Sequence, residues 1–245
     1  MISIIFFIFT LLSSSDSFTP TKDIHLSCKK IFEYIYTVEC QLPIDLQNSD
    51  IVRITSKNIT TNLPLKIAAS NMPEHFPQGV GQNFPEIEEL RIWWSELKFI
   101  DRESFTKLKI LKILDLIGNS IENIPTDTFY DLENVEEINL YKNHIKTLDA
   151  DLLIKNTKLK KFSAGQNEIE EIPKGFFRNN LEINWVDLIK NKIKKIDIDF
   201  TEFVNLKTIG LSGNDGECNF NYGIKAKYNQ TIDEFQEKIN LFCGN

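Results

Sequence analysis

The sequence is poor in the residues and motifs from which most active sites are built. Its 245 residues contain only three histidines, which are dispersed at His25, His75 and His144. There is no G-x-S-x-G, no H-E-x-x-H and no phosphate-binding glycine loop, so the signatures of common hydrolases, zinc proteases and nucleotide-binding proteins are absent. The acidic pair Asp197 and Asp199 is more simply explained as solvated surface. We therefore expect a protein that is not an enzyme and that holds no cofactor or metal.

A basic excess is lacking as well. The chain has 28 Lys and Arg against 35 Asp and Glu, which gives a formal net charge of −7 at pH 7. Nucleic acids and anionic membranes attract proteins mainly through positive charge. The composition therefore disfavours both as partners.

Long apolar runs are almost absent. The run at residues 4–12 is too short to span a bilayer, and the small residues Ser15 and Ser17 follow it at the −3 and −1 positions of a cleavage site. Residues 1–17 are thus interpreted as a secretory signal peptide, although the segment has no Lys or Arg before the apolar run. The alternative is a buried strand at the N-terminus. No later run is long enough for a membrane span, and the C-terminus lacks a hydrophobic lipid-anchor tail, so we expect a secreted, extracellular protein.

What the chain does have is asparagine at a fixed interval. Asn119, Asn143, Asn167 and Asn191 are 24 residues apart, and Asn214 follows after 23. Each ends a similar frame of the form L-x-x-L-x-L-x-x-N, which predicts a solenoid of stacked repeats. Since side chains alternate along a strand, one set in each frame should face the core: Leu114 and Leu116, Ile138 and Leu140, Phe162 and Ala164, Val186 and Leu188, Ile209 and Leu211. We expect the asparagines to form a buried ladder that satisfies backbone groups at each turn.

The same spacing appears behind the predicted strands. A spine of large apolar residues is expected at Phe105, Phe129, Leu153 and Phe177, with Phe200 one residue short of the interval. Two weaker repeats precede the array and carry serine in the asparagine position: they lie at residues 90–97, with Ser95, and 65–72, with Ser70. Residues 51–55 are a candidate first strand, because terminal repeats commonly depart from the consensus.

Four cysteines flank the array. Cys28 and Cys40 precede it, whereas Cys218 and Cys243 follow it, and about six strand spacings, roughly 30 Å, separate the two pairs. Because a disulfide tolerates Cα atoms only about 4.4–6.8 Å apart, we expect Cys28–Cys40 and Cys218–Cys243 bonds, each closing a cap. A zinc site is disfavoured, since there is no C-x-x-C and the histidines are dispersed.

The C-terminal segment predicts a capping helix. Thr231 and Glu234 form a capping box, and apolar residues follow at helical spacing at Ile232, Phe235, Ile239 and Phe242. Asn58 and Asn229 begin glycosylation sequons, which are used only on secreted chains.

Residues 87–214 resemble the 24-residue extracellular class of leucine-rich repeats, as in Toll-like receptor ectodomains, Slit-type guidance proteins and small matrix proteoglycans. With its signal, N-terminal cysteine loop and short C-terminal cap, the chain is most similar to small secreted insect leucine-rich-repeat proteins. The resemblance implies an α/β leucine-rich-repeat solenoid with a curved parallel sheet on the concave side, an irregular or 3-10 convex side and disulfide caps. The expected divisions are 1–17 for the signal, 18–62 for the N-terminal cap and first strand, 63–214 for the array and 215–245 for the C-terminal cap.

Function is expected on the concave face, which solenoids use for binding. The outward strand positions carry an unusual number of apolar and aromatic residues, which often mark interfaces. The predicted partner-binding residues are Arg91, Trp93, Ile113, Asp115, Ile117, Tyr141, Trp185, Asp187 and Ile189. Trp94, nearer the turn, is expected to lie flat against the sheet. The resemblance implies recognition of an extracellular protein, or of a glycan, and inhibition of a secreted enzyme is the alternative function.

Overall fold

The computed structural model of the chain describes residues 74–77, 79–196, 198 and 203–215 and, outside these, six strands. Those six are β1 (Lys22–His25), β2 (Ser27–Lys30), β3 (Thr37–Gln41), β4 (Val52–Thr55), β5 (Leu65–Ser70) and β14 (Leu241–Phe242). The other strands are β6 (Ile87–Ile92), β7 (Ile113–Asp115), β8 (Glu137–Asn139), β9 (Lys161–Ser163), β10 (Glu171–Ile172), β11 (Trp185–Asp187), β12 (Lys195–Ile196) and β13 (Thr208–Gly210). Two helices of four residues each, α1 (Val80–Asn83) and α2 (Arg102–Phe105), lie in the connections.

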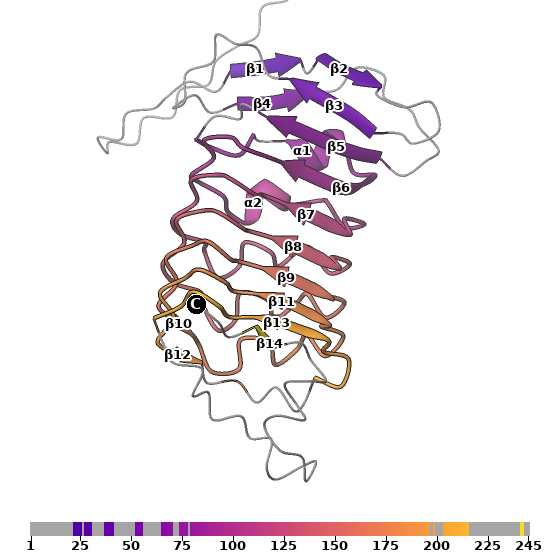
Figure 1. The fold of residues 1–245 in the computed structure, drawn as a ribbon. Helices are drawn as coiled ribbons and strands as arrows, with labels where there is room; N and C mark the ends of the chain where they lie inside the picture. Colours follow the sequence, from indigo (N-terminus) through magenta and orange to yellow (C-terminus); the bar gives the residue numbers. More distant parts are fainter. Residues whose placement is uncertain are drawn as a thin grey trace, which may run out of the picture.

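One sheet runs the length of the molecule (Figure 1). Its ten described strands are ordered β14-β13-β11-β9-β8-β7-β6-β5-β3-β2, and every neighbouring pair except β2 and β3 is parallel. Within the array the register follows the sequence period, so that Leu90, Leu114, Ile138 and Phe162 lie side by side. The fold is therefore the parallel solenoid that the repeat predicts.

The first strands depart from the expected order. Residues 51–55 were a candidate first strand of the array, but β4 pairs with β1 in a separate two-stranded sheet. The neighbour of β5 is instead β3, which β2 joins as an antiparallel edge strand. An antiparallel edge cannot be read from a repeat frame, because residues 22–41 have no such frame.

The pairing of β2 with β3 places Cys28 directly opposite Cys40. Opposed residues in antiparallel strands have Cα atoms about 4.5–5.5 Å apart, within the range that a disulfide accepts. The Cys28–Cys40 bond itself stays a prediction.

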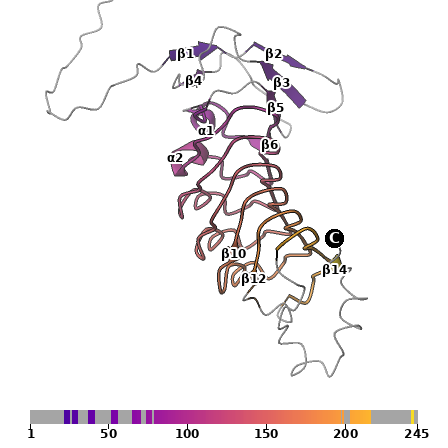
Figure 2. The same ribbon diagram turned by 60° about the vertical axis from the view of Figure 1, so that its left-hand side comes forward.

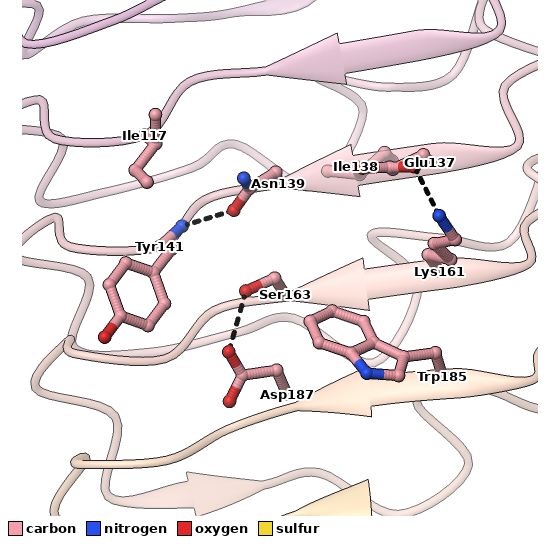
Figure 3. A pocket seen from close by; sticks show the side chains of 9 residues that line it. All are labelled: Ile117, Glu137, Ile138, Asn139, Tyr141, Lys161, Ser163, Trp185 and Asp187. Atoms are coloured by element: carbon pink, nitrogen blue, oxygen red, sulfur yellow. Dashed lines mark hydrogen bonds and ion pairs between the residues drawn. The ribbon is translucent and has the colours of Figure 1, made fainter. Parts of the chain in front are cut away.

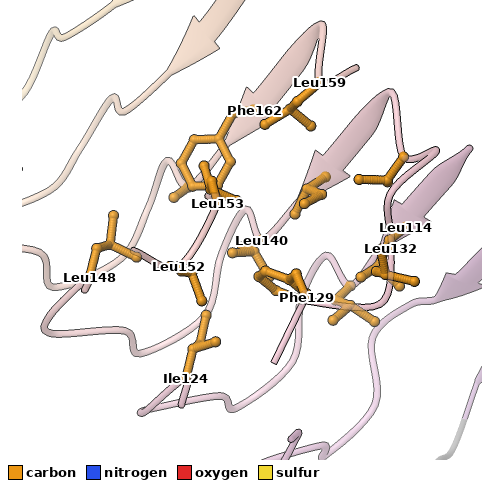
Figure 4. Packing of buried hydrophobic residues seen from close by; sticks show 14 of the residues in the cluster. Leu114, Ile124, Phe129, Leu132, Leu140, Leu148, Leu152, Leu153, Leu159 and Phe162 are labelled. Atoms are coloured by element: carbon orange, nitrogen blue, oxygen red, sulfur yellow. The ribbon is translucent and has the colours of Figure 1, made fainter. Parts of the chain in front are cut away.

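The core lies between the sheet and the returning segments (Figure 4), and the predicted inward residues fill it. Leu114, Leu116, Ile138 and Leu140 are completely buried. Each buried aliphatic side chain of this size contributes roughly 1.5–3 kcal/mol relative to exposure. No single repeat could bury its apolar edge alone, so the stacking of repeats is what stabilises each of them.

The predicted spine is present behind the strands. Phe105, Phe129, Leu153 and Phe177 are at most 1% exposed, and the ring centroids of Phe105 and Phe129 are 5.8 Å apart. Phe200, the fifth predicted member, lies outside the described residues. Phe203 packs edge-on against Phe177 with centroids 6.4 Å apart.

The asparagine ladder is confirmed. Asn143 donates through Nδ2 to the carbonyl oxygens of Leu116 and Leu140, each at 3.0 Å, and its Oδ1 accepts the backbone N–H of Ile121 at 3.0 Å. Asn167 and Asn191 repeat this pattern one and two turns on. Each amide therefore ties its own turn to the turn before it. Because the side chains are buried, losing one would leave several backbone groups without partners.

At the start of the ladder the pattern is incomplete. The Oδ1 atom of Asn119 is buried and accepts no hydrogen bond within the described part of the chain. By the pattern of the later turns, its donor would be the N–H of Leu97, in the repeat where Ser95 replaces asparagine. In that repeat, the hydroxyl of Ser95 donates to the carbonyl of Trp93 at 3.2 Å.

A second buried pair of asparagines was not predicted. Asn156 and Asn180 are completely buried on the far side of the core from the sheet. Asn156 donates to the carbonyls of Phe129 and Leu132, and Asn180 to those of Leu153 and Asn156. The two residues are 24 apart, but the preceding repeats carry Leu108 and Leu132 at the equivalent position. Two asparagines alone did not form a repeat long enough to predict a second ladder.

The segments opposite the sheet are chains of turns (Figure 2), with β10 and β12 forming a short parallel pair among them. Between β7 and β8 the bonds link residues three apart, for example Thr128 N–H to Pro125 and Leu132 N–H to Phe129. This spacing is that of 3-10 helices. The expected irregular side of the solenoid is therefore built from single turns of this kind.

The C-terminal expectation needs a correction. Phe242 was predicted on the apolar face of a helix, but Leu241 and Phe242 form β14, which pairs in parallel with β13. An end strand exposes unpaired backbone groups, and a returning segment that pairs with it satisfies them. The predicted signal at 1–17, the sequons at Asn58 and Asn229, Cys218, Cys243 and the rest of the predicted helix lie outside the described residues.

Candidate partner-binding face

The sheet face, defined as the outward positions of β6, β7, β8, β9, β11 and β13 and of the residues just after them, carries the predicted binding residues. None of the predicted apolar or aromatic ones points into the core. Trp93 is 36% exposed. Ile113, Ile117, Tyr141, Trp185 and Ile189 are half-buried.

Four of the predicted residues meet in one pocket (Figure 3). It has a volume of about 290 Å³ and crosses four neighbouring strands of the sheet, β7, β8, β9 and β11. Its lining comprises the predicted Ile117, Tyr141, Trp185 and Asp187 and the unpredicted Glu137, Ile138, Asn139, Lys161 and Ser163. Arg91, Trp93, Ile113, Asp115 and Ile189 lie outside this lining.

Glycine shapes the pocket beside the Tyr141 ring. A Cβ atom on Gly165 would lie 2.9 Å from ring atoms of Tyr141 and 3.1 Å from a carboxylate oxygen of Asp187. Gly165 follows Tyr141 by one repeat, so the missing side chain lets the ring fold down over the next turn. Gly210 makes the same kind of room beside Ile189 and Asp187. Neither glycine was among the predicted binding residues; the signal in the sequence was the position of Gly165 one repeat after Tyr141.

Both predicted aspartates are largely buried. Asp115 is 6% exposed and Asp187 is 8% exposed. Each accepts the N–H of the residue two places on, Ile117 at 3.3 Å and Ile189 at 3.1 Å. Such short-range bonds are typical of Asx turns. Both carboxylates therefore help to turn the chain at the end of a strand.

Their electrostatic surroundings differ. Asp115 pairs with Arg91, with Nη1 and Oδ2 3.1 Å apart, and Arg91 also pairs with Glu89 at 3.1 Å. Asp187 accepts the hydroxyl of Ser163 at 3.2 Å, and no ion pair to it occurs within the described residues. Burial raises the pKa of Asp187 above its ordinary value, against the opposing effect of the Ile189 and Ser163 bonds.

The aromatic wall of the pocket is affected by the same carboxylate. Burial raises the pKa of the Tyr141 hydroxyl, and the nearby charge of Asp187 raises it further. Tyr141 is therefore neutral at physiological pH. The remaining charges at the pocket belong to Glu137 and Lys161, which pair with each other at 3.2 Å.

A second aromatic site lies nearer the first repeats. The guanidinium of Arg91 is 5.7 Å from the ring centroid of Trp93. Trp94 lies against Gly118, as expected of a flat side chain, but it is 60% exposed, and the ammonium of Lys142 is 4.7 Å from its ring centroid. Sequence reasoning did not include Trp94 and Lys142 in the binding set. The signal in the sequence was Gly118, one repeat after Trp94, because a glycine there leaves room for the indole ring.

Trp94, Gly118 and Lys142 also share a backbone feature. All three have positive φ, as do Gln166, Lys190 and Gly213 at the same place in later repeats. Left-handed backbone is uncommon for residues other than glycine. The conformation therefore recurs once per repeat from residue 94 to residue 213.

Within the described residues no group of three or more His, Cys, Asp or Glu is placed to hold a metal ion. In that same part of the chain, no helix has the length and apolar character required to cross a bilayer.

Comparison with known proteins agrees with this architecture. Residues 85–145 and 114–169 match the family model described as leucine rich repeat. The solved LRIM1/APL1C complex is similar with a TM-score of 0.65 and 19% identity, over 78% of this chain and 35% of that chain. The APL1 leucine-rich repeat domain gives a TM-score of 0.64 and 17% identity, over 79% of this chain and 49% of that one. The chain spans less than half the length of either, and no curated protein matches it in sequence.

The fold is thus a leucine-rich-repeat solenoid, with few helices and one long parallel sheet. Proteins built this way generally act by binding other proteins.

Proposed function

We propose that the protein is a secreted recognition module that binds another extracellular protein through its sheet face. The observation that carries the proposal is the pocket at Tyr141 and Trp185, where aromatic side chains stay half-exposed on a sheet face that solvation would favour as polar. Tyrosine and tryptophan dominate binding energy at protein interfaces. One of the similar solved structures is a complex of LRIM1 and APL1C, which supports a partner that is a protein.

Several features favour the extracellular setting. The chain opens with an apolar run followed by small residues at a cleavage spacing. Cys28 and Cys40 lie opposite each other in paired strands, where an oxidising compartment would allow a bond. Nothing in the described sheet face favours enzyme inhibition over other protein recognition, so inhibition remains one form of the same proposal.

The test is affinity capture from the native extracellular fluid with three forms of the chain. The first is the wild type and the second carries Trp93→Ala, Tyr141→Ala and Trp185→Ala. The third is a matched control in exposed apolar residues of the connections between strands, Tyr130→Ala, Leu181→Ala and Val204→Ala.

A protein captured by the wild type and the control, but lost with the sheet-face variant, is the expected result. Losses of about 1–4 kcal/mol are typical of such anchor residues, or roughly five- to a thousandfold in affinity. Equal capture by the wild type and the sheet-face variant would contradict the proposal. Circular dichroism of each variant checks that folding is unchanged.

A further inference from the structure

The pocket on the sheet face carries an unbalanced negative charge. Glu137 and Lys161 neutralise each other across neighbouring strands. Asp187 has no cation opposite it within the described residues, whereas Asp115, at the same position three strands earlier, has Arg91. The position between them is filled by Asn139 and Ser163, neither of which is charged. One negative charge therefore faces the hollow without an internal counter-ion.

The carboxylate is not needed for the turn that it makes. Asn139 occupies the same repeat position, and its Oδ1 accepts the N–H of Tyr141 at 3.0 Å, as Asp187 accepts that of Ile189 at 3.1 Å. An amide at position 187 would keep this bond without a buried charge. Burial penalises ionised carboxylates, and the raised pKa of Asp187 reflects that penalty. A group retained against such a cost is typical of a functional site.

The walls of the pocket complement a cation in a second way. The Tyr141 and Trp185 side chains lie on opposite sides of Ser163 and Asp187 (Figure 3). Aromatic faces attract ammonium and guanidinium groups, and a carboxylate accepts charge-assisted hydrogen bonds from them. The volume, about 290 Å³, lies just below the roughly 300–1,000 Å³ typical of small-molecule sites. It suits one long side chain rather than a large ligand.

We propose that this pocket receives a lysine or arginine side chain of the protein partner, with its apolar stem between Tyr141 and Trp185 and its cationic group on Asp187. The inference rests on the proposed function, because it names the partner chemistry that the same face would select.

The test uses single residues as probes and needs no identified partner. The chain contains three tryptophans, so protein labelled with 5-fluorotryptophan has three fluorine signals, and a Trp185→Phe variant identifies the one at the pocket. The probes are the N-acetyl methylamides of arginine and lysine. Their neutral counterparts are the same derivatives of citrulline and norleucine.

We expect the cationic probes to shift the Trp185 signal saturably, with dissociation constants of the order of millimolar, since one side chain makes few contacts. Asp187→Asn should weaken their binding by about tenfold or more. Asp115→Asn is the matched control, because it removes a carboxylate in the same turn geometry that Arg91 already neutralises. It should leave the titration unchanged.

A pH series provides a second readout. Binding should strengthen as pH rises through the raised pKa of Asp187, since only the ionised carboxylate attracts a cation. The other charged or titratable groups at the pocket are Glu137, Lys161 and Tyr141. Glu137 is also a carboxylate, so the pH effect assigned to Asp187 is the part that Asp187→Asn abolishes.

Two outcomes would overturn the proposal: shifts of equal size with norleucine and citrulline, or affinity unchanged in Asp187→Asn. Neither outcome bears on whether the sheet face binds a protein. Conversely, if the cationic probes bind as described but the sheet-face variant still captures the partner, the proposed function fails and the cation pocket stands.

Discussion

Charged residues on the flank of the solenoid are paired with opposite charges in the next repeat, whereas one carboxylate on the sheet face has no such partner in the part of the chain that the structure describes. Along one flank, acidic and basic residues alternate from repeat to repeat, at Glu74, Lys98, Glu122, Lys146, Glu170 and Lys194. Neighbours in this row form ion pairs at 2.7, 3.7 and 3.8 Å. A second row, Glu88, Lys112, Glu136 and Lys160, does the same at 2.7 and 2.8 Å. Asp187 in the pocket differs, because no ion pair to it occurs within the described residues.

The difference is informative because a neighbouring repeat could readily provide an oppositely charged side chain for Asp187. A single substitution 24 residues away places the opposite charge in the next turn, as the flanking rows do several times. Exposed pairs of this kind add little to stability individually, yet they prevent like charges from stacking. A carboxylate left without such a partner, in a more buried position, therefore points to a partner from outside the chain.

The largest expected effect comes from the ladder that supports both regions. Asn167→Leu removes the bonds to the carbonyls of Leu140 and Ala164 and leaves the N–H of Ile145 without its acceptor. We expect a loss of roughly 3–5 kcal/mol in the free energy of unfolding, because several buried groups lose partners at once. Urea unfolding followed by circular dichroism measures it. Asn134→Leu is the control and should cost far less, because Asn134 is only half-buried and its bond to the carbonyl of Lys109 is solvent-exposed.

A second change alters the pocket and leaves the flank intact. Gly165→Ala places a methyl group against the ring of Tyr141, which can move because it is the free end of a side chain. We expect stability to fall by about 1 kcal/mol and the binding of the arginine probe to weaken several-fold.

Combining this change with Tyr141→Ala separates the two effects. The double variant should recover the stability that the clash removes, because the ring is gone, but not the binding. A double-mutant cycle on unfolding free energies tests this coupling. Additive losses would show that Gly165 and Tyr141 do not interact.

On the flank, the corresponding change is a reversal of charge. Lys112→Glu would place a third carboxylate between Glu88 and Glu136, whose present pairing with lysines lowers the pKa of Glu136 and raises that of Lys112. The expected cost is no more than about 1 kcal/mol at low ionic strength, since the side chains are largely solvated. It should shrink in 1 M salt. Lys112→Gln is the control, and an effect insensitive to salt would show that it is not electrostatic.

The smallest effect is a gain in stability at the pocket. The folded-state pKa of Asp187 is raised, so the folded protein loses stability from this group as pH rises above the unfolded value of about 4. Asp187→Asn should therefore stabilise the fold at pH 7, by about 1 kcal/mol or less. The gain should vanish at pH values below the unfolded pKa, where the carboxyl is protonated in both states. Thermal unfolding at pH 3 and pH 7 compares the two, and a loss at pH 7 would show that the carboxylate stabilises the turn.

Most of the array could be predicted because its period constrains it. The inward residues from Leu114 to Leu211 and the ladder from Asn119 to Asn191 follow from one frame repeated five times. The strands before Leu65 could not be ordered, since pairing between β1 and β4 depends on tertiary contacts that leave no period. Phe242 was assigned to a helix because its spacing from the preceding apolar residues fits a helix, whereas the open edge of β13 favours a strand.

The binding face was predicted in outline rather than in detail. Alternation alone placed Trp93, Tyr141 and Trp185 outside. It could not show that Asp115 is neutralised by Arg91 or that Gly165 opens the hollow, because both depend on contacts between neighbouring repeats. Trp94 was set aside as flat, yet a ring lying on Gly118 keeps one face in solvent.

Hydrogen–deuterium exchange of the protein with and without its captured partner tests the central claim most directly. The account predicts slower exchange in peptides that contain residues 113–118, 137–142 and 185–190 of the sheet face. Peptides from the opposite turns, at residues 125–132 and 149–156, should exchange at an unchanged rate. Protection confined to those turns, with the sheet face unaffected, would contradict it.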